Sequence, residues 1–166
     1  MKTIEWIPPG VKEMIFLLKD QGFPVKKVAE TNSNEYLIVA KGKNKSRSYK
    51  LKIEFNEALG IVYFATKCLK PVPSKKYHFA LELLNQLSLA SIQTSYAICP
   101  KALRMTCFIA VSYQNTVSKI EMVDDEFLWG IWYGIGSLNR ISNGIEKKMS
   151  IEDIIEDEFP SEKSAL

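Results

Sequence analysis

The chain has 166 residues, of which 46% are hydrophobic and 25% charged, and its formal net charge is +3 at pH 7. These values are typical of one globular domain that needs neither metal nor disulfide to hold its core. The small positive charge does not by itself indicate a nucleic-acid partner. No apolar run of about 18 residues predicts a membrane span, and the start of the chain lacks the apolar core of a signal peptide. We therefore expect a cytoplasmic protein with no membrane partner.

The three cysteines, Cys68, Cys99 and Cys107, fall in apolar, strand-like segments. Their odd number and wide spacing argue against a disulfide framework and against a zinc site. We expect buried, reduced thiols, no metal and no cofactor. A reactive thiol would need a basic neighbourhood, and Cys68, between Lys67 and Lys70, comes nearest to having one.

A first helix is predicted between Pro8 and Gly22. Proline is tolerated in a first helical turn, and glycine followed by Pro24 is a common helix end. The apolar residues of this segment are spaced as one helical stripe; they are Val11, Met14, Ile15 and Leu18.

Three strands are predicted next, over residues 35–41, 48–55 and 61–69. The loops between them, 42–46 and 56–60, are short, polar and contain glycine, so they indicate hairpins. The middle strand alternates strictly between apolar and charged residues, which places one of its faces in the core and the other in water.

A second helix is expected from Ser74, as its N-cap, to about Leu89. Strands follow at 92–98 and 103–111, joined by a tight connection at 100–102. Residues 112–122 are read as a loop or a short edge strand. A long helix then begins at Asp124, which is placed to cap it, and Asn143-Gly144 either ends this helix early or forms a weak point within it.

The C-terminal residues 150–166 form an acidic, amphipathic tail. Ser150 followed by Asp153 resembles a capping box, whereas residues 160–166 look frayed. The order of elements is therefore α-β-β-β-α-β-β-α, which predicts an α+β fold with an antiparallel sheet of about five strands and helices mainly on one face. We expect one domain over residues 1–149, followed by the tail.

This layout resembles the YbjN family, and the segment Leu81-Glu82-Leu83-Leu84-Asn85-Gln86-Leu87 carries the motif-like match at Asn85. The resemblance covers about residues 11–148. The family consists of bacterial proteins described as sensory transduction regulators, with a fold similar to that of type III secretion chaperones. The resemblance implies a non-enzymatic regulator or chaperone-like binder that is frequently dimeric, and it supplies no catalytic residues.

The residues themselves also give no sign of an active site. The single histidine, His78, stands beside lysines in the second predicted helix and is expected at the surface, without a nucleophile to activate. Gly130, Gly134 and Gly136 lie inside the last helix rather than between a strand and a helix, so they do not form a nucleotide-binding loop. We predict that the protein is not an enzyme.

The glycines of the last helix require a different explanation. Gly130 and Gly134 are four residues apart and share a helical face, and each glycine costs about 1 kcal/mol relative to alanine. Either close packing of the helix on the sheet or close approach of a second subunit or partner helix would offset that cost.

Aromatic residues cluster in the same turns as these glycines. Trp129, Trp132 and Tyr133 are either core residues or anchors of an interface, a role for which tryptophan and tyrosine are favoured. The hypothesis is a dimer or partner interface made of Trp129, Trp132, Tyr133, Gly130, Gly134 and Gly136.

The largest charged feature is a basic stretch around the first hairpin. Its residues are Lys41, Lys43, Lys45, Arg47, Lys50 and Lys52. It is either a solvated edge that discourages strand-to-strand aggregation or a patch for an acidic partner or nucleic acid. Tyr49 interrupts the stretch but should point inward, so no stacking platform is evident.

Two functions from different classes follow. The first is a protein-binding regulator or chaperone-like module whose partner is another protein, and which is itself a homodimer. The alternative is a nucleic-acid-binding module that uses the basic hairpin 41–52.

Overall fold

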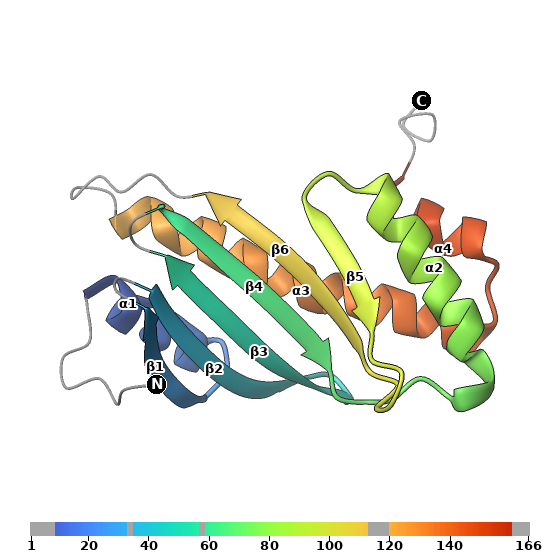
Figure 1. The fold of residues 1–166 in the computed structure, drawn as a ribbon, viewed down its shortest axis with the longest axis horizontal. Helices are drawn as coiled ribbons and strands as arrows, with labels where there is room; N and C mark the ends of the chain where they lie inside the picture. Colours follow the sequence, from blue (N-terminus) through green and yellow to red (C-terminus); the bar gives the residue numbers. More distant parts are fainter. Residues whose placement is uncertain (1–8, 33–34, 57–58, 113–119, 161–166) are drawn as a thin grey trace.

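The computed structural model describes residues 9–32, 35–56, 59–112 and 120–160. Its fold is α+β with an antiparallel sheet, as predicted, and the sheet has six strands rather than about five (Figure 1). The elements are α1 (Pro9–Asp20), β1 (Val25–Asn32), β2 (Glu35–Asn44), β3 (Arg47–Asn56), β4 (Ile61–Cys68), η1 (Ser74–Lys76), α2 (Tyr77–Ala90), β5 (Thr94–Ile98), β6 (Met105–Ser112), α3 (Ile120–Lys147) and α4 (Ile151–Glu158).

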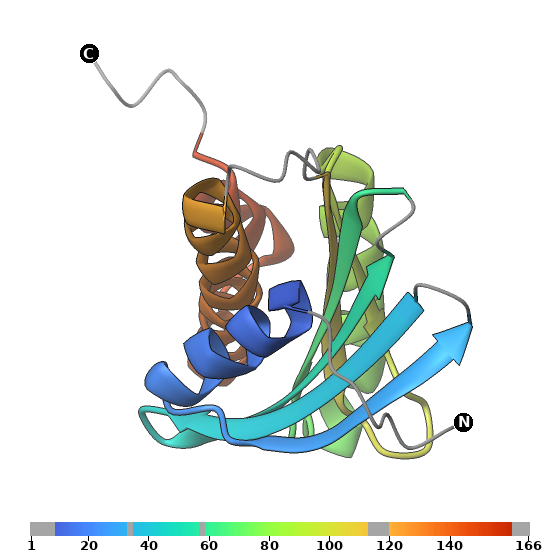
Figure 2. The ribbon, with the colours of Figure 1, turned by 90° about the vertical axis from the view of Figure 1, so that its left-hand side faces the viewer.

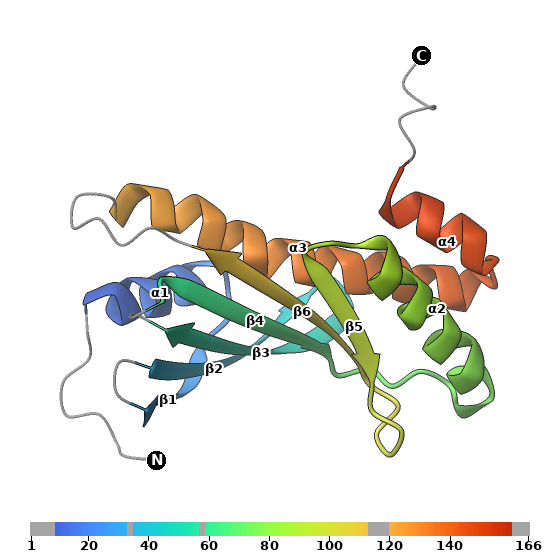
Figure 3. The ribbon, with the colours of Figure 1, turned by 45° about the horizontal axis from the view of Figure 1, so that its top comes forward.

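The strands are arranged in the order β1-β2-β3-β4-β6-β5, and every neighbouring pair is antiparallel. Helices α1 and α3 cover one face of this sheet (Figure 2). Helix α2 runs beside the edge strand β5, and α4 turns back to pack against α3 and α2 (Figure 3). The opposite face of β3, β4 and β6 carries no helix in the described part of the chain (Figure 1).

The core lies between the sheet and the layer of α1 and α3. Strand β3 alternates as predicted, with its apolar side chains buried and Lys50, Lys52 and Glu54 exposed. Burying one large apolar side chain stabilises a fold by about 1.5–3 kcal/mol. The apolar stripe of α3 is also buried; it consists of Phe127, Ile131, Ile135, Leu138, Ile141 and Ile145.

Strand β1 was not predicted, and the first hairpin is tighter than expected. Strand β1 lies at the sheet edge and pairs with β2 through two register irregularities. Strand β2 continues to Asn44, which pairs with Arg47, so the turn consists of Lys45 and Ser46 and not of residues 42–46. Lys45 has a φ of 53°, a left-handed conformation that so tight a turn imposes.

The helix ends differ from the predictions in two places. Helix α3 begins at Ile120, so Asp124 lies within it and does not cap it. Ser74 opens the short η1, and α2 begins at Tyr77 after Lys76 without a side-chain cap, so the predicted cap at Ser74 does not form.

Two further predictions concern the C-terminal region. Helix α3 continues through Asn143-Gly144 without a break. A Cβ at Gly144 would lie 2.5 Å from Cγ1 of Ile154, so this glycine allows α4 to pack directly on α3. The Ser150 cap of α4 is confirmed, because the Asp153 backbone N–H donates to Ser150 Oγ at 3.1 Å.

Some predictions fall outside the described residues. These are the helix start at Pro8, residues 57–58 of the second hairpin loop, residues 113–119 of the predicted loop or edge strand, and residues 161–166 of the tail. Among the helices that the structure describes, none combines the length and hydropathy that crossing a membrane requires.

Candidate binding surface

The outer face of the sheet, opposite α1 and α3, presents its side chains in rows. Residues paired directly across neighbouring strands point to the same side. Lys41 pairs with Lys50, and Lys50 pairs with Lys67, so these side chains lie next to one another across β2, β3 and β4. Neighbouring strands are about 4.8 Å apart. We call Lys41, Lys50 and Lys67 the lysine row.

Two aromatic side chains lie on the same face, further along the central strands. Tyr63 on β4 is 44% exposed and Phe108 on β6 is 42% exposed. Tyr63 pairs with Ala110, and Phe108 pairs with Ala65, so each ring has a small side chain as its cross-strand neighbour. We call Tyr63 and Phe108 the aromatic pair.

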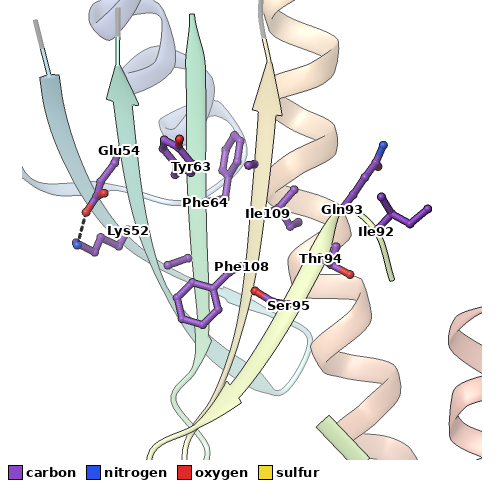
Figure 4. A pocket seen from close by; sticks show the side chains of 12 residues that line it. Lys52, Glu54, Tyr63, Phe64, Ile92, Gln93, Thr94, Ser95, Phe108 and Ile109 are labelled. Atoms are coloured by element: carbon purple, nitrogen blue, oxygen red, sulfur yellow. Dashed lines mark hydrogen bonds and ion pairs between the residues drawn. The ribbon is translucent and has the colours of Figure 1, made fainter. Parts of the chain in front are cut away.

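A hollow of about 520 Å³ opens around the aromatic pair (Figure 4). Lys52 and Glu54 line one side of it, where they form an ion pair with each other. The other side consists of the segment that leads into β5, with a fully exposed Ile92 and the polar Gln93 and Ser95. The hollow is therefore an open, mainly apolar depression with polar groups at its rim.

The charges of the molecule are distributed unevenly. Strand register places on the outer face the lysines Lys27, Lys41, Lys43, Lys50, Lys52 and Lys67, against Glu35 and Glu54. The exposed acids of α4 lie on the helix side of the sheet; they are Glu152, Asp153, Glu156 and Asp157 (Figure 2). The local field over the outer face is therefore more positive than the net charge of the chain implies.

The predicted basic stretch is only partly on this surface. Lys41 is on β2, Lys43 is on the same strand rather than in the predicted loop 42–46, and Lys45 is in the turn. Arg47 points inward, is 8% exposed, and forms an ion pair from Nη2 to Glu146 Oε1 at 3.0 Å. Arg47 therefore belongs to the core, which corrects its assignment to the patch.

Arg47 is part of a polar cluster that joins β3 to α3. Its Nη1 donates to Asn139 Oδ1 at 3.4 Å, and the hydroxyl of Tyr49 donates to the same oxygen at 2.5 Å. Tyr49 thus points inward, as predicted, and burial raises the pKa of its phenol. Lys70 Nζ lies 2.9 Å from Glu146 Oε1, and this hydrogen bond, more than that of Arg47, lowers the pKa of Glu146.

A second polar cluster holds α4. The side chain of Glu158 is fully buried and accepts a hydrogen bond from Arg140 Nε at 2.7 Å. Its other oxygen accepts from the hydroxyl of Tyr96 at 3.4 Å, and that hydroxyl is 2.8 Å from Ser137 Oγ. Residues 151–158, which belong to the predicted C-terminal tail, therefore pack on the domain.

The tryptophans of α3 lie on the side of that helix facing away from the sheet. Trp129 is 43% exposed and Trp132 is 39% exposed. Trp132 Nε1 donates to Gln21 Oε1 at 2.9 Å, and its ring meets Phe23 edge-on at 5.9 Å. The ring of Trp129 lies 5.0 Å from that of Tyr133, which is partly buried.

The glycines of α3 divide between two environments. A Cβ at Gly130 would lie 2.6 Å from Cε2 of Phe64, and one at Gly134 would lie 2.7 Å from Oγ1 of Thr66. Both glycines therefore allow close packing on the sheet and form no part of an exposed surface. Gly136 is partly exposed, and a Cβ there would meet only Arg140, at 3.4 Å.

The thiols differ from the expectation that all are buried. Cys68 and Cys107 are buried, but Cys99 is exposed in the turn between β5 and β6. Hydrogen bonds from the Ala102 and Lys101 backbone lower the pKa of Cys99, with a smaller contribution from neighbouring lysines. Burial raises the pKa of Cys68, so the position suspected of reactivity is the protected one.

Other groups suited to chemistry are sparse in the part of the chain that the structure describes. His78 is exposed, as predicted, and its ring contacts that of Tyr77. The described residues contain no cluster of three histidine, cysteine or acidic side chains able to hold a metal ion.

These features define an α+β domain with helices on one face of its sheet and an open, basic and aromatic outer face. No family model matches the chain, and no match was found among the curated proteins. Among solved structures, the chain is similar in fold to YbjN of E. coli, a proposed transcription regulator. The two are 12% identical, the TM-score is 0.48, and the alignment covers 80% of this chain and 88% of that chain.

Proposed function

We propose that this chain is a non-enzymatic recognition domain that binds its partner on the outer face of its sheet. The observation that carries this proposal is the exposure of Tyr63 and Phe108 at the centre of that face. Side chains on a solvated sheet face are usually polar, and contiguous exposed apolar surface beside a polar rim often marks an interaction site. Burying each ring against a partner would contribute about 1.5–3 kcal/mol.

The hollow around the aromatic pair supports binding rather than catalysis. Its charged side chains, Lys52 and Glu54, form an ion pair with each other, and both are about half exposed. These two groups are therefore already paired with each other and open to solvent, which suits the rim of a binding surface.

The test is capture of partners from native lysate on immobilised protein, with recovered protein and nucleic acid measured separately. The variant Tyr63→Ala/Phe108→Ala should recover at least tenfold less of the specific partner, while Trp129→Ala should recover it like the wild type. Both rings are exposed by nearly half, so the double variant should remain folded, which a circular dichroism melt would check. Equal recovery by the double variant and the wild type would overturn the proposal.

A second candidate function is protein binding through α3, with a second copy of this chain as the partner. It is favoured by the exposure of Trp129 and Trp132 on one side of α3, because tryptophan is a frequent interface anchor. Light scattering across a range of concentrations tests it: the wild type should be a dimer and Trp129→Ala should dissociate more readily. Trp129 is the better position for this change, since Trp132 also contacts Phe23 and Gln21. A wild type that is monomeric at every concentration would exclude this candidate.

A further inference from the structure

We infer that the ligand of the outer face is single-stranded nucleic acid, with bases stacked on Tyr63 and Phe108 and phosphates bound by Lys41, Lys50 and Lys67. This inference rests on the proposed recognition face and names the chemical class of its partner.

The lysine row holds like charges in adjacent positions. Lys41 is directly opposite Lys50, and Lys50 is directly opposite Lys67. Like charges placed directly across a strand pair destabilise a sheet, and no ion pair among the described residues neutralises these lysines. A bound polyanion would relieve this repulsion. The acid nearest to the row on the outer face of β3, Glu54, is paired with Lys52 and adds little repulsion to a phosphate.

The spacing of the groups suits a nucleic-acid strand. Phe108 pairs with Ala65, which lies two residues along β4 from both Tyr63 and Lys67. Tyr63, Phe108 and the lysine row thus occupy successive rows about 7 Å apart, since a strand rises about 3.4 Å per residue. A nucleic-acid strand running along β4 would therefore contact the two aromatic rings first and the lysine row next. Aromatic rings beside a positively charged track are the usual means of holding single strands without strong sequence preference.

A duplex fits this face less well than a single strand. The bases of a duplex are stacked on each other, so it could offer only its phosphates to the lysine row and would leave the aromatic pair uncovered. Single-stranded bases can separate and stack on tyrosine or phenylalanine. The two rings therefore discriminate in favour of single strands.

An extended peptide that adds to a sheet edge is disfavoured by the edges themselves. At the β5 edge, the backbone N–H of Tyr96 donates to Ser88 Oγ at 2.9 Å, and that of Thr94 donates to Ser91 Oγ at 3.0 Å. A peptide strand that added to this edge would need these two N–H groups as hydrogen-bond donors, and both are already used. The β1 edge carries two register irregularities, which also oppose strand addition.

The experiment measures fluorescence anisotropy of a fluorescein-labelled mixed-sequence 20-mer, as DNA, as RNA and as a DNA duplex, between 50 and 300 mM salt. The variant Lys41→Gln/Lys50→Gln/Lys67→Gln removes the lysine row. Its matched control, Lys12→Gln/Lys19→Gln/Lys147→Gln, makes the same change of net charge at exposed positions on α1 and α3. The single change Lys50→Glu serves as a second variant of the row that perturbs the sheet less.

The wild type should bind single strands at least tenfold tighter than the duplex. The lysine-row variant should lose at least tenfold in affinity, and its slope of log K against log salt should shrink by about 2, because each phosphate contact on a single strand contributes about 0.7. Tyr63→Ala/Phe108→Ala should also lose at least tenfold, but with the salt slope preserved. The matched control should remain within threefold of the wild type.

Three results would overturn the inference: no binding of either single strand, equal affinity of the row variant and its matched control, or tighter binding of the duplex. The lysate experiment separates this failure from that of the proposed function. If the lysate yields a protein whose recovery depends on the aromatic pair while the 20-mers do not bind, the recognition face stands and the nucleic-acid ligand is excluded. If neither dependence is seen, both proposals fail.

Discussion

The variant Gly130→Ala tests how closely α3 lies on the sheet. The added Cβ would be 2.6 Å from Cε2 of Phe64 and 2.9 Å from its Cδ2 and Cζ. Phe64 is 2% exposed, and its ring packs against Phe127 with the centroids 5.4 Å apart. The ring cannot move aside freely, so the helix must shift away from β4 or the core must deform.

Two opposing contributions determine how far Gly130→Ala changes the free energy of unfolding. Alanine is about 1 kcal/mol more favourable than glycine within a helix, whereas inserting a methyl group into a packed core costs about 1–3 kcal/mol. Gly130→Ala should therefore be neutral to destabilising by about 2 kcal/mol. Gly136→Ala is the matched control, since its Cβ would meet only Arg140, at 3.4 Å, and that variant should gain about 1 kcal/mol.

The quantity to measure is the difference in free energy of unfolding between the two variants, by urea denaturation. The helix-propensity term cancels, so the control should be more stable by the packing term alone, about 1–3 kcal/mol. For a chain of this size, each kcal/mol also corresponds to about 2–4 °C in melting temperature. Equal stability of the two variants would refute the reasoning, and the glycine would then need a role outside the folded monomer, such as contact with a partner helix.

Three further predictions follow from local contacts. Ser150→Ala removes the cap of α4 and should lower the unfolding free energy by about 1 kcal/mol, measured by thermal melting; an unchanged melt would show that α4 is held without its cap. Native protein should react with one equivalent of iodoacetamide, at Cys99, and denatured protein with three, counted by mass spectrometry; rapid loss of a second native thiol would contradict the burial of the others. Glu146→Gln should cost at most about 1 kcal/mol at pH 7, because the carboxylate is partly exposed. The pKa of Glu146 is lowered in the folded state, so its contribution is present above about pH 4.5 and fades as the pH falls further; a difference from the variant that persisted at pH 2 would disprove this origin.

The elements that the sequence predicted well are those whose burial pattern repeats over many residues. Strand β3 has one apolar and one charged face along its whole length, and α3 keeps a helical stripe from Phe127 to Ile145. Each pattern fits one regular structure only, since a period of two and a period of 3.6 place side chains on different faces. The prediction of antiparallel strands with helices on one side followed from the order of these segments.

Strand β1 escaped prediction because it is an edge strand that packs little apolar surface. Its residues include Lys26, Lys27 and Glu30, and Ala29 is its one buried side chain. Edge strands commonly carry charges that discourage aggregation, and such segments look like polar loops. Such a segment becomes a strand because a neighbouring segment pairs with it, and for β1 that segment is β2.

The candidate surface was predicted only in part, because it depends on strand register. Lys67 joins Lys41 and Lys50 through the pairing of β4 with β3, which no local pattern specifies. Tyr63 lies in a continuous apolar run, so its outward direction was hidden. Phe108 gave a signal, since it alternates with apolar residues on the polar side of its strand.

The two proposed surfaces lie on opposite layers of the molecule and are compatible with each other. Self-association through the outer side of α3 would leave the outer face of each sheet free, because the sheet and the core separate the two surfaces (Figure 2). In a symmetric dimer of this kind the two outer faces point away from each other. A short single strand could then occupy one face only, whereas a strand long enough to pass around the dimer could occupy both. Avidity between the faces would therefore appear as a steep rise of affinity with strand length beyond one site, and a monomer would show no such rise.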